Sequence, residues 1–176
     1  MLFLPICLAL LGVDPMHHAA THPAPGPEHA RLATLAGTWD VELTVWQKAG
    51  ALPEKSRGFA VVEPLFGGLF VQERMEGLAG EVPFVELTWL GFDPASKRYQ
   101  LTRIGSGAAA MATRDGTFDE RQQALVLEGP AAIAGDRERR TLRLSSADER
   151  IVQCQRVPRS GEPWQSCELR YTRRKG

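Results

Sequence analysis

Apolar and polar residues change their spacing abruptly near residue 37. Over residues 29–36 the apolar side chains recur at helical spacing, which predicts a short helix. Gly37 can adopt the left-handed conformation that often ends a helix. From Trp39 to Val45 apolar residues alternate with polar ones, which is the pattern of a strand with one buried face.

Nine more short strands are predicted along the chain, separated by turn residues such as Gly67-Gly68 and Asp115-Gly116. Seventeen glycines and twelve prolines suit a fold with many turns. No long helical pattern interrupts the series, so the sequence predicts an all-β barrel or sandwich. The ten predicted strands cover residues 39–45, 59–65, 69–76, 82–92, 99–104, 108–113, 124–127, 139–144, 151–157 and 164–172.

A set of motifs points to one kind of barrel. The chain contains, in order, GTWDVELTVW, GGLFVQERMEG, LGFDPASKRYQLTRIGSG, DGTFDE and LRYTRR. Over residues 29–173 this series resembles a bacterial family of lipocalin-like (calycin-type) barrels of unknown function, the domain of unknown function 1579. One departure is Phe92, where the family usually has a tyrosine. The resemblance implies a single antiparallel up-and-down barrel of about ten strands, with the helix plugging one end and Trp39 packed across it. It brings no established activity.

The first 28 residues are predicted to lie outside the barrel domain, which we place at residues 29–176. The apolar run LFLPICLALLGV has the length of a signal-peptide core and is too short to span a bilayer, which favours export to the periplasm or beyond. No basic residue precedes it and no clear cleavage site follows, so the alternative is a cytoplasmic protein that starts at Met16. Residues 14–28 lack any period and suggest a disordered lead-in.

Charge excludes some partners. The chain has 21 basic and 21 acidic residues, so no strong overall field would attract nucleic acid or an anionic membrane. We therefore expect no nucleic-acid partner and no stable membrane insertion, whereas a homodimer is possible.

Two cysteines are placed to face each other. Cys154 and Cys167 flank Ser160-Gly161 symmetrically, so a two-residue hairpin turn there would set them directly opposite, with close Cβ atoms. We favour a disulfide, which would agree with export. The alternative is a pair of free core cysteines.

No catalytic or cofactor motif stands out. The chain lacks a nucleophile elbow, a phosphate-binding Gly-Lys loop and metal-binding His or Cys pairs at the usual spacings. All four histidines precede the first strand, so the commonest general base and metal ligand is missing from the predicted strands. A haem-binding barrel of the nitrobindin kind resembles this fold but needs an axial histidine from its strands. We therefore predict no cofactor and no metal site.

Strand parity gives the candidate binding site. Glu73 shares a face with Val71 and Met75, and Arg103 shares a face with Tyr99. If these apolar faces point inward, a carboxylate and a guanidinium enter the lumen, where they could form a structural ion pair or anchor a ligand. Glu86 and Thr88 would enter only if the parity of the fourth strand were reversed. The predicted ligand-binding residues are Glu73, Arg103, Tyr99, Trp89, Met75 and Trp39.

Three functions follow from this pattern. The first is binding of a small, largely apolar or amphipathic ligand in the lumen. The second is an isomerase or hydrolase that uses Glu73 as acid or base. The third is a structural or interaction barrel with a filled core, for which Trp46 and the apolar residues on both faces of 82–92 are the favouring features.

Overall fold

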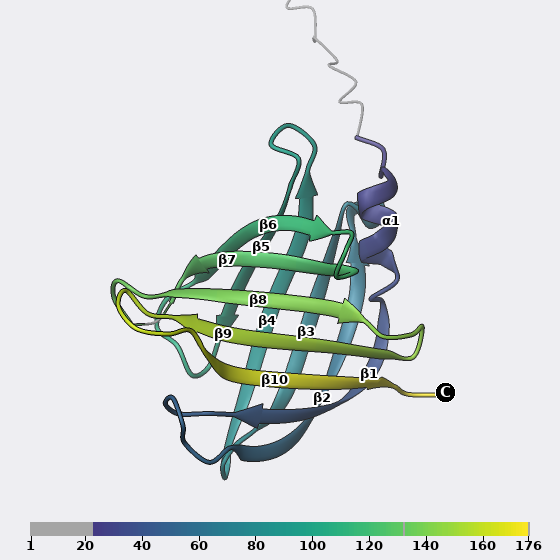
Figure 1. Ribbon diagram of the computed structural model, residues 1–176. Coiled ribbons are helices and arrows are strands. Elements are labelled where there is room, and N and C mark those ends of the chain that lie inside the picture. The colour runs from purple at the N-terminus through teal and green to yellow at the C-terminus, as the bar shows by residue number, and fades with distance from the viewer. Residues whose placement is uncertain (1–22, 132, 176) are drawn as a thin grey trace, which may run out of the picture.

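Ten antiparallel strands and one short helix make up the protein in the computed structural model, which describes residues 23–131 and 133–175 (Figure 1). The predicted signal-like run and most of the predicted lead-in, with His17, His18 and His22, lie outside the described residues. The elements in chain order are α1 (Pro27–Ala33), β1 (Gly37–Val45), β2 (Glu54–Leu65), the 3₁₀ turn η1 (Phe66–Gly68), β3 (Phe70–Ala79), β4 (Val82–Asp93), β5 (Arg98–Gly105), β6 (Ala112–Asp119), β7 (Ala124–Pro130), β8 (Arg137–Leu144), β9 (Glu149–Val157) and β10 (Trp164–Arg173).

Pairing of the first and last strands closes the sheet. Each strand pairs with its neighbours in the sequence, and β1 pairs with both β2 and β10. Val41, for example, faces Gly58 on one side and Tyr171 on the other. A closed sheet leaves no strand edge free to pair with another chain. The predicted all-β, up-and-down barrel of ten strands is confirmed.

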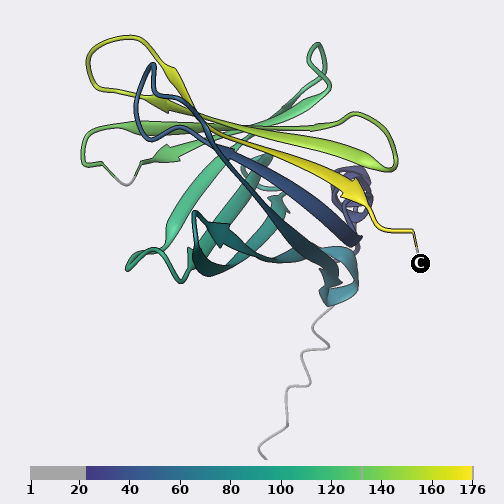
Figure 2. The same cartoon turned by 90° about the horizontal axis from the view of Figure 1, so that it is seen from below.

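The two ends of the barrel differ. Helix α1 lies against one end, as seen in Figures 1 and 2, and it buries Leu32 and the following Leu35 there. Trp39 is fully buried beneath it, and its indole Nε1 donates a hydrogen bond to the Leu35 carbonyl at 3.0 Å. This end is therefore closed, as the family resemblance implied. Five connections, after β1, β3, β5, β7 and β9, gather at the opposite end.

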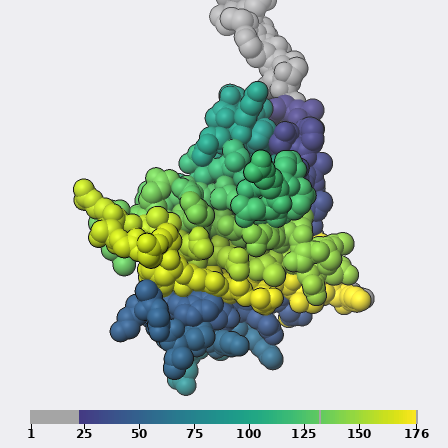
Figure 3. Space-filling model, viewed as in Figure 1, coloured from purple at the N-terminus to yellow at the C-terminus, as the bar shows by residue number. Residues whose placement is uncertain are grey.

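The strands alternate buried and exposed residues, and the buried ones form a core inside the barrel. The series Trp39, Val41 and Leu43 on β1 points inward, as does Val152 on β9 with Leu169 opposite it on β10. In the space-filling view the side chains of the later strands close the wall over this interior (Figure 3). The core thus lies along the barrel axis.

One predicted turn is wrong. Asp115-Gly116 was expected to end a strand at 108–113, but both residues lie within β6, which begins at Ala112. Gly116 is buried, and a Cβ on it would lie 2.9 Å from the Leu127 Cα and even closer to the Val126 carbonyl of β7. Here glycine permits a close approach of two strands rather than a reversal of the chain.

This close approach generates a stability prediction. Gly116→Ala should lower the free energy of unfolding by about 1–3 kcal/mol, because the new methyl group would push β7 away. Urea denaturation measures the change. Gly107→Ala is the control, because no atom lies within 4 Å of a Cβ at that position. Equal stability of the two variants would show that the approach of β6 and β7 is not tight.

Candidate functional site: the barrel lumen

The barrel encloses a cavity of about 420 Å³ in the half away from α1. It reaches the connections after β1, β3 and β5, so it opens at the end that α1 leaves uncovered. The lumen is therefore not filled by side chains, in contrast to the filled core of the third hypothesis. Its walls are mainly apolar and include Leu43, Met75, Phe84, Ile104, Ala112 and Leu169.

Met75 and Arg103 both line this cavity, so β3 and β5 have the predicted parity. Tyr99 also points inward but lies at the closed end, where its hydroxyl accepts a hydrogen bond from Arg31 Nη1 at 3.2 Å. A separate cavity of about 160 Å³ lies there between α1 and strands β5 to β8. Tyr99 thus faces a different space from Met75 and Arg103.

The predicted pairing of Glu73 with Arg103 is wrong. Glu73 forms its ion pair with Arg150 on β9, across the lumen. Arg103 pairs instead with Glu86 on the adjacent strand β4, at 3.2 Å between Nη1 and Oε2. Parity places a side chain inside a barrel, but it does not decide which of several inward charges will meet.

Glu73 belongs to a buried cluster beneath the cavity. Its Oε2 contacts Arg150, and its Oε1 accepts a hydrogen bond from the Tyr171 hydroxyl at 3.0 Å. Burial, and then the charge on Glu73, raise the pKa of Tyr171 well above its usual value, so the hydroxyl keeps its proton and donates. A pocket of only about 30 Å³ adjoins the cluster. Arg150 and Tyr171 therefore occupy both carboxylate oxygens of Glu73, and the adjoining pocket leaves little room for a substrate.

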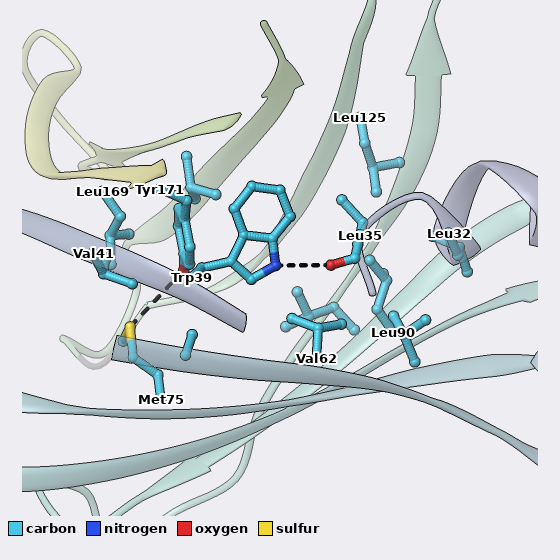
Figure 4. Close-up of a cluster of buried hydrophobic side chains, with 14 of the residues drawn as sticks. Leu32, Leu35, Trp39, Val41, Val62, Met75, Leu90, Leu125, Leu169 and Tyr171 are labelled. Atoms are coloured by element: carbon cyan, nitrogen blue, oxygen red, sulfur yellow. Dashed lines mark hydrogen bonds between the residues drawn. The ribbon is translucent and has the colours of Figure 1, made fainter. Parts of the chain in front are cut away.

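Trp39 links this cluster to the plug. Its ring meets the Tyr171 ring edge to face, with centroids 6.3 Å apart, and the Arg150 guanidinium carbon lies 4.8 Å from its centroid. Figure 4 shows the indole between Leu35 on the plug side and Tyr171 with Met75 on the other. Trp39 is fully buried and does not line the large cavity.

Trp89 does not line the lumen, contrary to the prediction. It lies on the outer face of β4, where its indole Nε1 donates to Gln72 Oε1 at 2.9 Å. The parity of β4 is the reverse of that assumed, so Glu86, Thr88 and Leu90 face inward. Residues 82–92 are apolar on both faces, and this removed the signal that would have fixed their direction.

Five further inward charges were missed by the sequence analysis. On β6, Arg114 pairs with Glu138 of β8 at 2.9 Å. Gly129 on β7, the strand between them, leaves room for the Arg114 side chain, because a Cβ at Gly129 would lie 2.8 Å from Arg114 Cγ. Burial lowers the pKa of Arg114, and the charge on Glu138 opposes that change. Arg140 and Arg150 are 4 % and 2 % exposed, and the fifth charge is Arg156, whose Nε and Nη1 are buried.

A signal for Arg140 was present. It shares its parity with Leu142 and Leu144 in the predicted strand 139–144, so the apolar face of that strand carries it inward. Arg150 lay one residue before the predicted strand 151–157 and had no assigned parity. The interior is therefore richer in arginine than predicted.

Cys154 and Cys167 lie opposite each other on β9 and β10, as the predicted register required. Both are free thiols in the structure, and a disulfide between them stays a prediction. A hydrogen bond with Cys167 lowers the pKa of Cys154, which burial opposes and nearby Arg140 reinforces. The same contact and burial raise the pKa of Cys167. A bulge between Gln165 and Cys167 shifts the register beyond this point, so Trp164 faces Arg156, whereas symmetric pairing about Ser160-Gly161 would set it opposite Val157.

The described residues hold neither a helix suited to span a membrane nor a cluster of metal ligands. None of their helices has the length and apolar character needed to cross a bilayer. Within residues 23–131 and 133–175 no group of three or more His, Cys, Asp or Glu side chains is arranged to hold a metal ion.

A closed ten-stranded barrel, plugged by a helix at one end and hollow at the other, defines a lipocalin-like barrel protein. The family model described as "Protein of unknown function (DUF1579)" matches residues 24–173, so the chain belongs to this family, and the predicted resemblance is confirmed. A comparison with curated protein sequences found no match.

Solved structures share the fold at low sequence identity. Rv2717c from M. tuberculosis superposes with a TM-score of 0.62 at 16% identity, covering 86% of this chain and 100% of that one. The S-type phycobiliprotein lyase CPES from Guillardia theta gives a TM-score of 0.59 at 13% identity, covering 85% and 93%. At this identity the likeness shows the fold alone.

The Glu73 cluster generates a stability prediction. Glu73→Gln should lower the free energy of unfolding by about 3–5 kcal/mol, because it leaves the charge of Arg150 buried without a partner. Chemical denaturation measures the loss. Glu76→Gln is the matched control on the same strand: its partner Arg74 is half exposed, and such pairs contribute about 1 kcal/mol or less. A small loss for Glu73→Gln would mean that the cluster does not hold the barrel together.

The facing thiols generate a second prediction. Mild oxidation with diamide should join Cys154 to Cys167 and raise the free energy of unfolding by about 2–4 kcal/mol, because the bridge restricts the unfolded chain. A Cys7→Ser background leaves these as the two thiols to be counted by alkylation and mass spectrometry. Cys167→Ser in that background is the control. Two thiols that remain free after oxidation would rule the bridge out.

Proposed function

We propose that the protein binds a small, largely apolar molecule in the lumen of its barrel. The observation that carries this proposal is the cavity of about 420 Å³ with mainly apolar walls. Small-molecule sites in proteins have volumes of about 300–1,000 Å³ and combine apolar walls with a few polar groups. Arg103 and Glu86 supply such polar groups here, since both line the cavity as an ion pair.

The open end of the barrel has a surface suited to an apolar ligand. Most of the exposed large apolar side chains lie in or beside the connections that surround the mouth. These residues are Leu52, Leu78, Val82, Met111 and Ile133. Two others, Phe66 and Phe70, lie near the plugged end.

The alternative of an enzyme with Glu73 as acid or base receives less support. Glu73 is held by Arg150 and Tyr171, and it adjoins the pocket of about 30 Å³ rather than the large cavity. A general base must reach a proton of the substrate within hydrogen-bonding distance. A phycobiliprotein lyase shares the fold, but the proposal does not rest on that likeness.

Filling the cavity tests the proposal. The neutral fluorescent compound N-phenylnaphthylamine should bind to the wild-type protein with enhanced emission. Ala112→Phe places a phenyl ring at the cavity wall and should weaken this binding by about tenfold or more, because overpacking costs about 1–3 kcal/mol.

Thr113→Phe is the matched control, because Thr113 is exposed on the outer face of the same strand. Thermal unfolding checks that both variants fold. Equal binding by wild type and Ala112→Phe would place the apolar site elsewhere and refute the proposed function.

A further inference from the structure

One buried guanidinium in the lumen has no carboxylate partner. Arg140 lies in the middle of β8 and is 4 % exposed. It forms no salt bridge and no side-chain hydrogen bond with any described residue. Arginine stays protonated at all physiological pH values, so this charge cannot be removed by proton loss. Arg140 lines the large cavity, and a charge in mainly apolar surroundings without a salt-bridge partner is costly, which makes Arg140 a place where an anion would be stabilised.

Three other inward arginines differ from Arg140, because each of them forms a salt bridge. Arg103, Arg114 and Arg150 each contact one glutamate, namely Glu86, Glu138 and Glu73. Among the described residues no carboxylate lies within salt-bridge distance of Arg140. Against the lowering effect of burial, Cys154, Tyr171 and then Glu86 raise the pKa of Arg140, but Glu86 forms its salt bridge with Arg103. Arg156, near the open end of β9, adds a second guanidinium with Nε and Nη1 buried and unpartnered. The lumen therefore carries more positive than negative charge.

Arg140 lies where the two interior spaces meet. It lines both the cavity of about 420 Å³ and the pocket of about 30 Å³ beneath it. It faces Cys154 in the register of β8 and β9 and therefore forms part of the floor of the large cavity. The walls between this floor and the mouth are mainly apolar, with Leu43, Phe84 and Leu169 among them.

We propose that Arg140 binds the carboxylate of an amphipathic ligand whose apolar body fills the cavity towards the mouth. This inference rests on the proposed function and deepens it, because it assigns the ligand class: a small apolar carboxylic acid. The guanidinium can form two parallel hydrogen bonds with a carboxylate. The ligand would supply the negative charge that the described residues do not provide.

Decanoate and decanol are matched probes, because they share an alkyl chain and differ in charge. Calorimetric titration at neutral pH should show that wild type binds decanoate about ten- to hundredfold more tightly than decanol, since hydrogen bonds to charged groups contribute strongly. Arg140→Met should remove this preference and leave decanol binding within about twofold. Arg140→Lys keeps the charge without the planar fork and should give an intermediate affinity for decanoate.

Arg139→Met is the matched control, because Arg139 lies on the outer face of the same strand and pairs with Glu128. It should behave as wild type. Equal binding of decanoate and decanol by wild type would overturn the inference. A preference for decanoate that is unchanged in Arg140→Met would overturn it as well. Either result leaves the proposed function intact. Failure of both compounds to bind wild type refutes the proposed function itself. The comparison of decanoate with decanol in the wild-type protein tests the inference even if Arg140→Met does not fold.

Discussion

Charge inside a closed barrel must be balanced without much help from water. Pairing of β1 with β10 removes the sheet edges, and α1 with Trp39 covers one end, so inward polar groups meet solvent mainly through the mouth. An ion pair in such surroundings is stable only when its remaining polar atoms are also satisfied. The Glu73 cluster meets this condition for the carboxylate, through Arg150 and Tyr171. The Glu73–Arg150 pair lies beneath the large cavity, whereas Arg140 lines that cavity.

Sequence periodicity predicted the architecture because a closed barrel repeats one simple pattern. Alternation on the first strand, the series of turns and the inward parity of Met75 and Arg103 all follow from local residue order. Ion-pair partners do not, because Glu73 meets Arg150 from a strand that is distant in the sequence. Trp89 was misplaced because its strand is apolar on both faces, and Gly116 because a glycine inside a strand resembles a turn.

Two charged residues of the lumen, Glu73 and Arg140, suggest different roles. Glu73 is enclosed by its partners next to a pocket of about 30 Å³, whereas Arg140 borders a space large enough for a small molecule. A group that serves the fold needs fixed partners, and a group that serves a ligand needs an unsatisfied bond and room beside it. This comparison supports the proposal that the interior binds a ligand.

The plug also has a kinetic consequence. Because Trp39 and α1 close one end, any guest must leave by the route through which it came, and a carboxylate at the floor would be the first part in and the last part out. Exchange of one guest for another then requires a vacant intermediate, since a newcomer cannot push the occupant through the barrel. Under the proposed function, residence time would be set by how the connections after β1, β3 and β5 move, whereas the identity of the guest would be set by side chains deeper in the lumen.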